Sequence, residues 1–113
     1  MIGGMKHTPS WFWLLLVLLL APGRAEDVTQ SVVLATVEGP IIPVVEAYLT
    51  RSLRLAESKG AILVVELDTP GGLVDTTRNI NRLILAADVP VVCYVAPRGA
   101  RAASAGVYIL YAS

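Results

Sequence analysis

The feature that most restricts the fold is an alternation of short apolar runs with amphipathic segments of helical periodicity. The apolar runs are SVVLATVEGP (31–40), AILVVEL (61–67) and VVCYVA (91–96). Runs of this length, rich in β-branched residues and bounded by turn residues, are typical of strands. The intervening segments have the length of the right-handed crossovers that connect parallel strands. The sequence therefore predicts an α/β fold of layered β-α-β units with a mostly parallel sheet.

The two segments between these strands are predicted to be helices because their apolar residues recur at helical spacing. The expected inward-facing positions are Val45, Leu49, Leu53 and Ala56 in the first, and Leu73, Thr77, Ile80, Ile84 and Ala87 in the second. Gly60 is placed to end the first helix as a C-terminal cap. Because residues 61–67 are almost continuously apolar, we expect that strand to be covered on both faces of the sheet. SAGVYILYAS (104–113) predicts the start of a third helix.

The N-terminal 25 residues have the order of a secretory signal. Lys6 and His7 precede the apolar run WFWLLLVLLLA (11–21), and Gly23 and Ala25 supply the small residues that a signal peptidase reads. The apolar run is much shorter than the ~20 residues of a transmembrane helix, although an uncleaved N-terminal anchor is the alternative. We therefore expect residues 1–25 to be a signal peptide and the mature, exported domain to begin at residue 26.

Composition and charge exclude several classes of function. The 113-residue chain is 55% hydrophobic and has a formal net charge of zero, which argues against a disordered chain and against an electrostatic nucleic-acid binder. Cys93, the one cysteine, is predicted to be a small buried residue, because the lone His7 belongs to the signal segment and leaves the thiol without a base. Glu66 and Asp68 lack the partners that a metal site needs, so we expect no metal and no cofactor.

Two loops leave the carboxyl ends of neighbouring predicted strands, which is where open α/β sheets place their sites. In DTPGG (68–72), two glycines precede a helix, and their N–H groups could face an anion; the alternative is an ordinary turn. In RGARAASAG (98–106), Ser104 stands among small residues at a helix start. Ser104 is either an N-cap or a nucleophile whose neighbours are small because a substrate must approach closely.

The two loops together are more informative than either alone. A nucleophile at Ser104, beside the amides of Gly71 and Gly72, would supply both halves of an acyl transfer. The hydroxyl would attack a carbonyl, and the glycine amides with the Ala105 N–H would stabilise the oxyanion. Leu73, directly after the glycine loop, and Arg101, three residues before Ser104, are the expected substrate-contacting residues, with plain surface charge as the alternative role for Arg101.

The segments VELDTPGGLVDTTRNI (65–80) and VPVVCYVAPRGARAASAG (89–106) closely resemble the NfeD-type membrane-bound serine proteases, the stomatin operon partner family. The resemblance covers residues 31–113 and implies the ClpP/crotonase fold, with Ser104 as nucleophile and Gly71, Gly72 and Ala105 as the oxyanion hole. It also implies cleavage of apolar peptide segments, such as the C-terminal region of stomatin-like proteins. A dimer or larger homo-oligomer and an extracytoplasmic or periplasmic, membrane-associated location are further implications.

The resemblance also implies a Ser-Lys dyad, and here the sequence departs from it. Lys59 is expected at the far end of the sheet from Ser104, and Lys6 lies in the signal segment, so neither lysine suits the base. We therefore expect residues 26–113 to be the N-terminal part of a longer serine protease domain, inactive by itself. Two alternatives remain: a non-catalytic relative that acts as a scaffold for peptides or partners, and a crotonase-type acyl-CoA enzyme.

Overall fold

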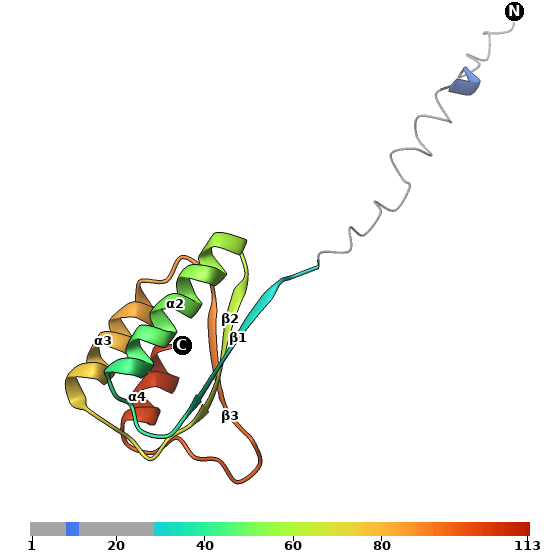
Figure 1. The fold of residues 1–113 in the computed structure, drawn as a ribbon. Helices are drawn as coiled ribbons and strands as arrows, with labels where there is room; N and C mark the ends of the chain where they lie inside the picture. The colour runs from blue at the N-terminus through green and yellow to red at the C-terminus, as the bar shows by residue number, and fades with distance from the viewer. Residues whose placement is uncertain (1–8, 12–28) are drawn as a thin grey trace, which may run out of the picture.

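The computed structural model describes residues 9–11 and 29–113. Strands and helices alternate in the order that the sequence predicts (Figure 1). The elements are β1 (Val32–Glu38), α2 (Pro43–Lys59), β2 (Ile62–Asp68), α3 (Val74–Leu85), β3 (Val91–Val95) and α4 (Ala105–Ala112). The predicted α/β fold with a parallel sheet is confirmed.

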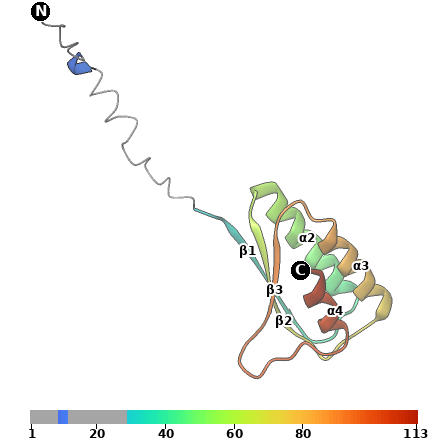
Figure 2. The same ribbon diagram turned by 180° about the vertical axis from the view of Figure 1, so that it is seen from behind.

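The three strands form a parallel sheet in the order β1-β2-β3, and all three helices lie on one face of it (Figures 1 and 2). Successive strands are added in one direction, so crossovers of the same hand bring α2 and α3 to the same side. The expectation that residues 61–67 are covered on both faces is therefore wrong for the part of the chain that the structure describes.

The core lies between the sheet and the three helices. Alternate residues of β2 are buried because successive side chains of a strand point to opposite faces. The buried apolar side chains are Ala35, Val37 and Ile41 around β1, Ala61 before β2, Leu63, Val65 and Leu67 in β2, Leu49, Leu53 and Ala56 in α2, Ile80 and Ile84 in α3, and Ala105 and Ile109 in α4. The helical faces expected for the first two helices are thus confirmed at most positions, although Leu73 precedes α3 and is exposed.

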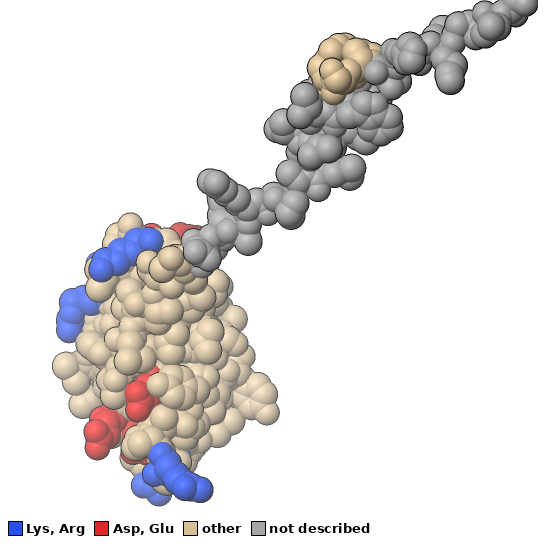
Figure 3. Space-filling model, turned by 90° about the vertical axis from the view of Figure 1, so that its right-hand side faces the viewer, with Lys and Arg blue, Asp and Glu red and all other residues tan. Residues whose placement is uncertain are grey.

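The opposite face of the sheet is apolar and open. Its exposed side chains include Val32 and Leu34 of β1 and Val92 and Tyr94 of β3. Figure 3 shows this face largely free of charge along its middle, with most charged side chains toward its ends. Glu66 lies on this face, where its carboxylate accepts a hydrogen bond of 3.2 Å from the Tyr94 hydroxyl.

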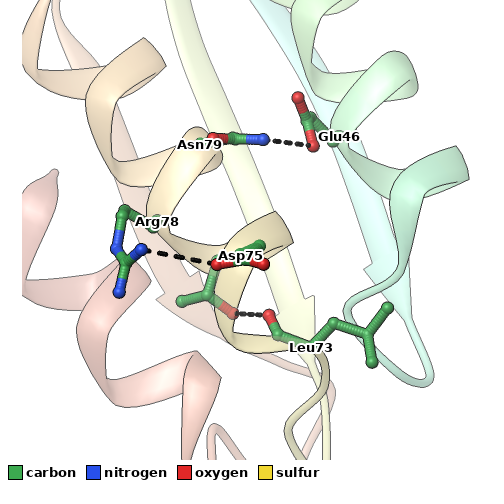
Figure 4. Close-up of polar contacts among 6 residues, drawn as sticks. Glu46, Leu73, Asp75, Arg78 and Asn79 are labelled. Atoms are coloured by element: carbon green, nitrogen blue, oxygen red, sulfur yellow. Dashed lines mark hydrogen bonds and ion pairs between the residues drawn. The ribbon is translucent and has the colours of Figure 1, made fainter.

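The ends of α2 and its contact with α3 follow from local sequence. Pro43 stands in the first turn, where its missing N–H has no helical partner to lose. Gly60 adopts the left-handed conformation (φ 58°, ψ 32°) and caps the last turn, as predicted. The Asn79 side-chain amide of α3 donates a hydrogen bond of 3.3 Å to the Glu46 carboxylate of α2, which joins the two helices on the surface (Figure 4).

Among residues 9–11 and 29–113, the structure contains no helix with the length and hydropathy to cross a bilayer. Apart from residues 9–11, the segment predicted to be a signal peptide lies outside the described residues.

Candidate active site

The two loops singled out in the sequence lie side by side at the carboxyl ends of β2 and β3. Thr69 continues the line of β2 and pairs with Ala102 as an isolated parallel bridge. The Thr69 N–H donates to the Arg101 carbonyl at 2.7 Å, and the Ala103 N–H donates to the Thr69 carbonyl at 3.0 Å. The Arg101 N–H donates to the Asp68 carboxylate at 3.1 Å. These bonds fix the serine loop to the glycine loop.

Gly71 lies directly against Ser104. A Cβ atom built on Gly71 would fall 2.9 Å from the Ser104 Cβ and 3.3 Å from its Oγ, so a side chain there would displace the serine. Gly71 also has φ of +124°, a conformation that residues with a Cβ rarely adopt. The absence of a side chain at Gly71 is therefore what allows the hydroxyl to approach the glycine turn.

Ser104 has the backbone of a strained strand-to-helix turn. Its φ of 51° and ψ of −112° make it the sole non-glycine residue with positive φ in the described chain. The side chain is exposed and makes no capping hydrogen bond to α4, so Ser104 stands at the N-cap position without acting as an N-cap. Strain of this kind is concentrated at functional sites, and here it presents the hydroxyl to solvent.

The amide groups around Ser104 differ in whether they are already paired. The Gly71 N–H donates to the Thr69 hydroxyl at 3.1 Å. Within residues 29–113, the N–H groups of Gly72 and Ala105 have no hydrogen-bond partner. Gly72 is held in place by Ile41, whose N–H donates to the Gly71 carbonyl and whose carbonyl accepts from Leu73, each at 2.9 Å. The amides available to an oxyanion are therefore those of Gly72 and Ala105.

A groove of about 340 Å³ runs between α3 and α4, with Ser104 at its edge. Gly72 and Ala105 also line it, so the nucleophile candidate and both unpaired amides border the same space. The remaining lining residues are Val74, Thr77, Arg78, Asn81, Arg82, Leu85 and Tyr108. Arg78 pairs with Asp75 at 3.4 Å on the exposed side of α3, and Thr77 bonds the Leu73 carbonyl at the start of this helix (Figure 4).

Four other residues discussed in the sequence analysis, Leu73, Arg101, Lys59 and Cys93, do not line this groove. Leu73 is 53% exposed at the start of α3, and the Arg101 backbone helps to fix the serine loop. Lys59 ends α2, at the opposite end of the sheet from the loop that carries Ser104 (Figure 1), as expected. Cys93 is half-buried, and burial raises the pKa of its thiol, so it is protonated at neutral pH and lacks the reactivity of a thiolate.

The sequence did not indicate that Thr69 belongs to the site, nor why residue 106 is a glycine. A Cβ atom on Gly106 would lie 2.7 Å from the Thr69 methyl group and 3.0 Å from the Ala102 Cβ. Residue 106 must therefore be glycine because α4 packs closely on the end of β2. The only signal for Thr69 in the sequence is its position directly before Pro70 and the two glycines.

The strain at Ser104 gives a prediction about stability. Replacing Ser104 with glycine removes the steric penalty of its positive φ, which is of order 1–3 kcal/mol, and adds a chain-entropy cost of roughly 0.5–1 kcal/mol. We expect Ser104→Gly to raise the free energy of unfolding by about 1 kcal/mol in urea titrations, with Ser58→Gly in α2 destabilising as the control. A loss of stability in Ser104→Gly would contradict the strained backbone.

Comparison with known proteins identifies the family. The model of the NfeD1b N-terminal domain matches residues 31–113. The chain belongs to the NfeD1b family. Membrane-bound protease PH1510 of Pyrococcus horikoshii is 38% identical to this NfeD1b-family chain over 101 residues, which are 88% of the chain and 22% of the relative. Membrane protein NfeD1b of Bacillus subtilis is 35% identical over 96 residues, which are 84% of this chain and 21% of that relative. The chain thus spans about a fifth of the length of these relatives.

Solved structures extend the NfeD1b assignment to the fold. The 1510-N membrane-bound stomatin-specific protease, as a lysine-to-alanine mutant in complex with a substrate peptide, superposes with a TM-score of 0.73 at 40% identity, covering 74% of this chain and 39% of that one. An asparagine-to-aspartate mutant of ClpP1 from Listeria monocytogenes superposes with a TM-score of 0.65 at 22% identity. The superposition covers 72% of this chain and 46% of the ClpP1 chain. The ClpP-like fold expected from the sequence is confirmed.

Proposed function

We propose that residues 26–113 are the N-terminal part of a ClpP/crotonase-like serine protease domain and that the full gene product is a serine endopeptidase. The single observation that carries this proposal is the geometry of Ser104. Its exposed hydroxyl stands on a strained turn, lies against Gly71 and borders a groove with two unpaired amides. An N-cap serine or an ordinary glycine turn requires none of these features.

In the proposed reaction, the Ser104 Oγ attacks the carbonyl carbon of a peptide bond while a base takes the hydroxyl proton. The developing oxyanion accepts hydrogen bonds from the N–H groups of Gly72 and Ala105. The tetrahedral intermediate then collapses, the C–N bond breaks, and the amine leaves with the proton from the base. Water hydrolyses the resulting ester and restores the hydroxyl. Gly71 serves this site by leaving room for Ser104.

The base in this proposal is a lysine that follows Ser113 in the longer product. A serine hydroxyl is a poor nucleophile at neutral pH without a base. Lys59 cannot serve, because it lies at the other end of the sheet. The homologous 1510-N protease was solved with a substrate peptide as a lysine-to-alanine mutant, which is in keeping with a lysine of importance in that protein.

We propose an apolar peptide as the substrate. Val74, Leu85 and Tyr108 expose apolar surface along the groove. Leu73 and Arg101 do not line it, but both are exposed, and we propose them as substrate contacts outside the groove. The 1510-N relative is described as specific for a stomatin homolog, which supports a stomatin-like membrane protein as the target here. We further propose a homo-oligomer that is exported by the signal peptide and acts at the extracytoplasmic or periplasmic surface of a membrane.

A non-catalytic scaffold is the second candidate. The observation that favours it is the absence of any lysine near Ser104 within residues 29–113. In that case the groove would bind a peptide or partner without cleaving it. The protease homologue favours cleavage over this alternative and over acyl-CoA chemistry.

The experiment that separates protease from scaffold is covalent labelling of the full gene product with a fluorophosphonate. Attack by an activated serine forms an O–P bond and releases fluoride, so the adduct adds a defined mass to one residue. We expect peptide mapping to find the adduct on Ser104 and not on the exposed Ser58 or Ser113, together with cleavage of a quenched apolar peptide. Absence of both the adduct and the cleavage would support the scaffold and reject the protease.

A further inference from the structure

Thr69 has a fully buried side chain whose hydroxyl is bonded to a single neighbour. Thr69 is 0% exposed. Its Oγ1 accepts a hydrogen bond of 3.1 Å from the Gly71 N–H and donates one of 3.2 Å to the Gly71 carbonyl. The hydroxyl therefore holds both peptide groups of Gly71, on either side of its Cα. A glycine has the greatest backbone freedom of any residue, so these two bonds, together with the one from the Ile41 N–H to the Gly71 carbonyl, restrict the motion of this turn.

The rest of Thr69 contacts the serine loop and α4. Its backbone N–H donates a hydrogen bond of 2.7 Å to the Arg101 carbonyl, and its carbonyl accepts one of 3.0 Å from the Ala103 N–H. Its methyl group occupies the space that a side chain on Gly106 would need. One buried residue thus touches the glycine turn, the loop before Ser104 and the first turn of α4, which are the three segments that border the candidate active site.

We propose that Thr69 is the positioning residue of this site. Its hydroxyl fixes the Gly71 peptide groups, and in doing so it keeps the following Gly72 N–H at the groove beside Ala105. Thr69 touches neither substrate nor nucleophile and acts through Gly71 and the serine loop. This inference rests on the proposed protease function, since it concerns how the same site is held in its reactive arrangement.

The test compares three variants of the full gene product. Thr69→Val keeps the shape of the side chain and removes both bonds to Gly71, whereas Thr69→Ser keeps the hydroxyl. A small displacement of a catalytic group reduces turnover by up to about 10²-fold, so we expect kcat for an apolar peptide to fall roughly 10- to 100-fold in Thr69→Val. KM should change less than about threefold, because the groove between α3 and α4 is intact, and Thr69→Ser should restore most of kcat. Thr50→Val removes a hydroxyl-to-backbone bond within α2 and should leave kcat unchanged.

A second measurement does not depend on activity. The Gly71 N–H is buried and hydrogen-bonded, so hydrogen–deuterium exchange of this single amide, followed by NMR, should be slow in the parent protein, whereas the unpaired Gly72 N–H should exchange fast in every variant. We expect exchange at Gly71 to accelerate in Thr69→Val and to return toward the parent rate in Thr69→Ser, with Thr50→Val unaffected.

These readouts distinguish failure of the inference from failure of the proposed function. If the parent protein cleaves no peptide, the protease proposal is wrong, and the exchange data still test whether the hydroxyl holds the Gly71 turn. If the parent is active and Thr69→Val keeps the parent kcat and exchange rate, Thr69 is not the positioning residue. If Thr69→Val fails to fold, the serine variant decides, because loss of kcat despite its hydroxyl would overturn the proposal.

Discussion

Ser104→Ala is expected to abolish peptide cleavage by the full gene product, with kcat reduced by about 10⁴-fold or more. The alanine removes the oxygen that forms the acyl-enzyme and leaves the Gly72 and Ala105 amides in place. Stability should change by less than about 0.5 kcal/mol, because the Ser104 side chain is exposed and makes no capping bond. Alanine also has the same difficulty with positive φ as serine. Cleavage rates and thermal unfolding of both proteins provide the measurement.

The matched control is Ser58→Ala. Ser58 is exposed near the end of α2 and bonds the Leu55 carbonyl at 2.8 Å, at the opposite end of the sheet from the groove. This variant should cleave at the parent rate. Undiminished turnover in Ser104→Ala would eliminate Ser104 as the nucleophile, whereas equal losses in both variants would indicate a general effect on the protein.

Gly72→Ala is expected to have the largest effect on folding. A Cβ atom on Gly72 would overlap the backbone oxygen of Ile41 and would lie 2.5 Å from its N and 2.6 Å from its Cα. Ile41 is completely buried and bonds both Gly71 and Leu73, so its backbone cannot move aside without breaking two hydrogen bonds. We expect the free energy of unfolding to fall by about 3 kcal/mol or more, a large part of the 5–15 kcal/mol that stabilises a typical domain.

Gly99→Ala is the control for the glycine substitution. Gly99 has φ of +90°, and nothing lies within 4 Å of its missing Cβ, so alanine there meets strain without a clash. We expect a loss of about 1–2 kcal/mol in urea unfolding. If Gly72→Ala is no more destabilising than Gly99→Ala, the close approach of Ile41 to Gly72 is not present in solution.

The sequence predicts the elements well because their signals are local. Leu49, Leu53 and Ala56 recur at helical spacing, and all three are buried on the inner face of α2. Gly60 ends that helix as expected, since a left-handed cap needs a residue without Cβ. The meeting of the Ser104 loop with the glycine turn was also predictable, because parallel strands present their carboxyl ends at one edge.

Features that depend on contacts between distant segments were not predictable. The sequence does not reveal that the Thr69 hydroxyl accepts a hydrogen bond from the Gly71 N–H, because this bond depends on a side-chain rotamer that packing against α4 determines. The exposure of one sheet face was also missed, since an apolar run such as AILVVEL looks the same whether one or both of its faces are covered. Glu66 illustrates the result: it belongs to this apolar run, and its carboxylate accepts a hydrogen bond from the Tyr94 hydroxyl on the open face.

The pairing of Thr69 with Arg101 and Ala103 has a consequence for how this region can vary in length. The chain is anchored where β3 ends and again at Arg101, and the exposed turn around Gly99 bulges out between these two points. Residues added to or removed from that turn change the bulge and leave the anchored ends where they are. The same change after Arg101 would shift the hydroxyl by a whole residue. Homologues can therefore diversify the outer turn freely, whereas the four residues that end at Ser104 must keep their count.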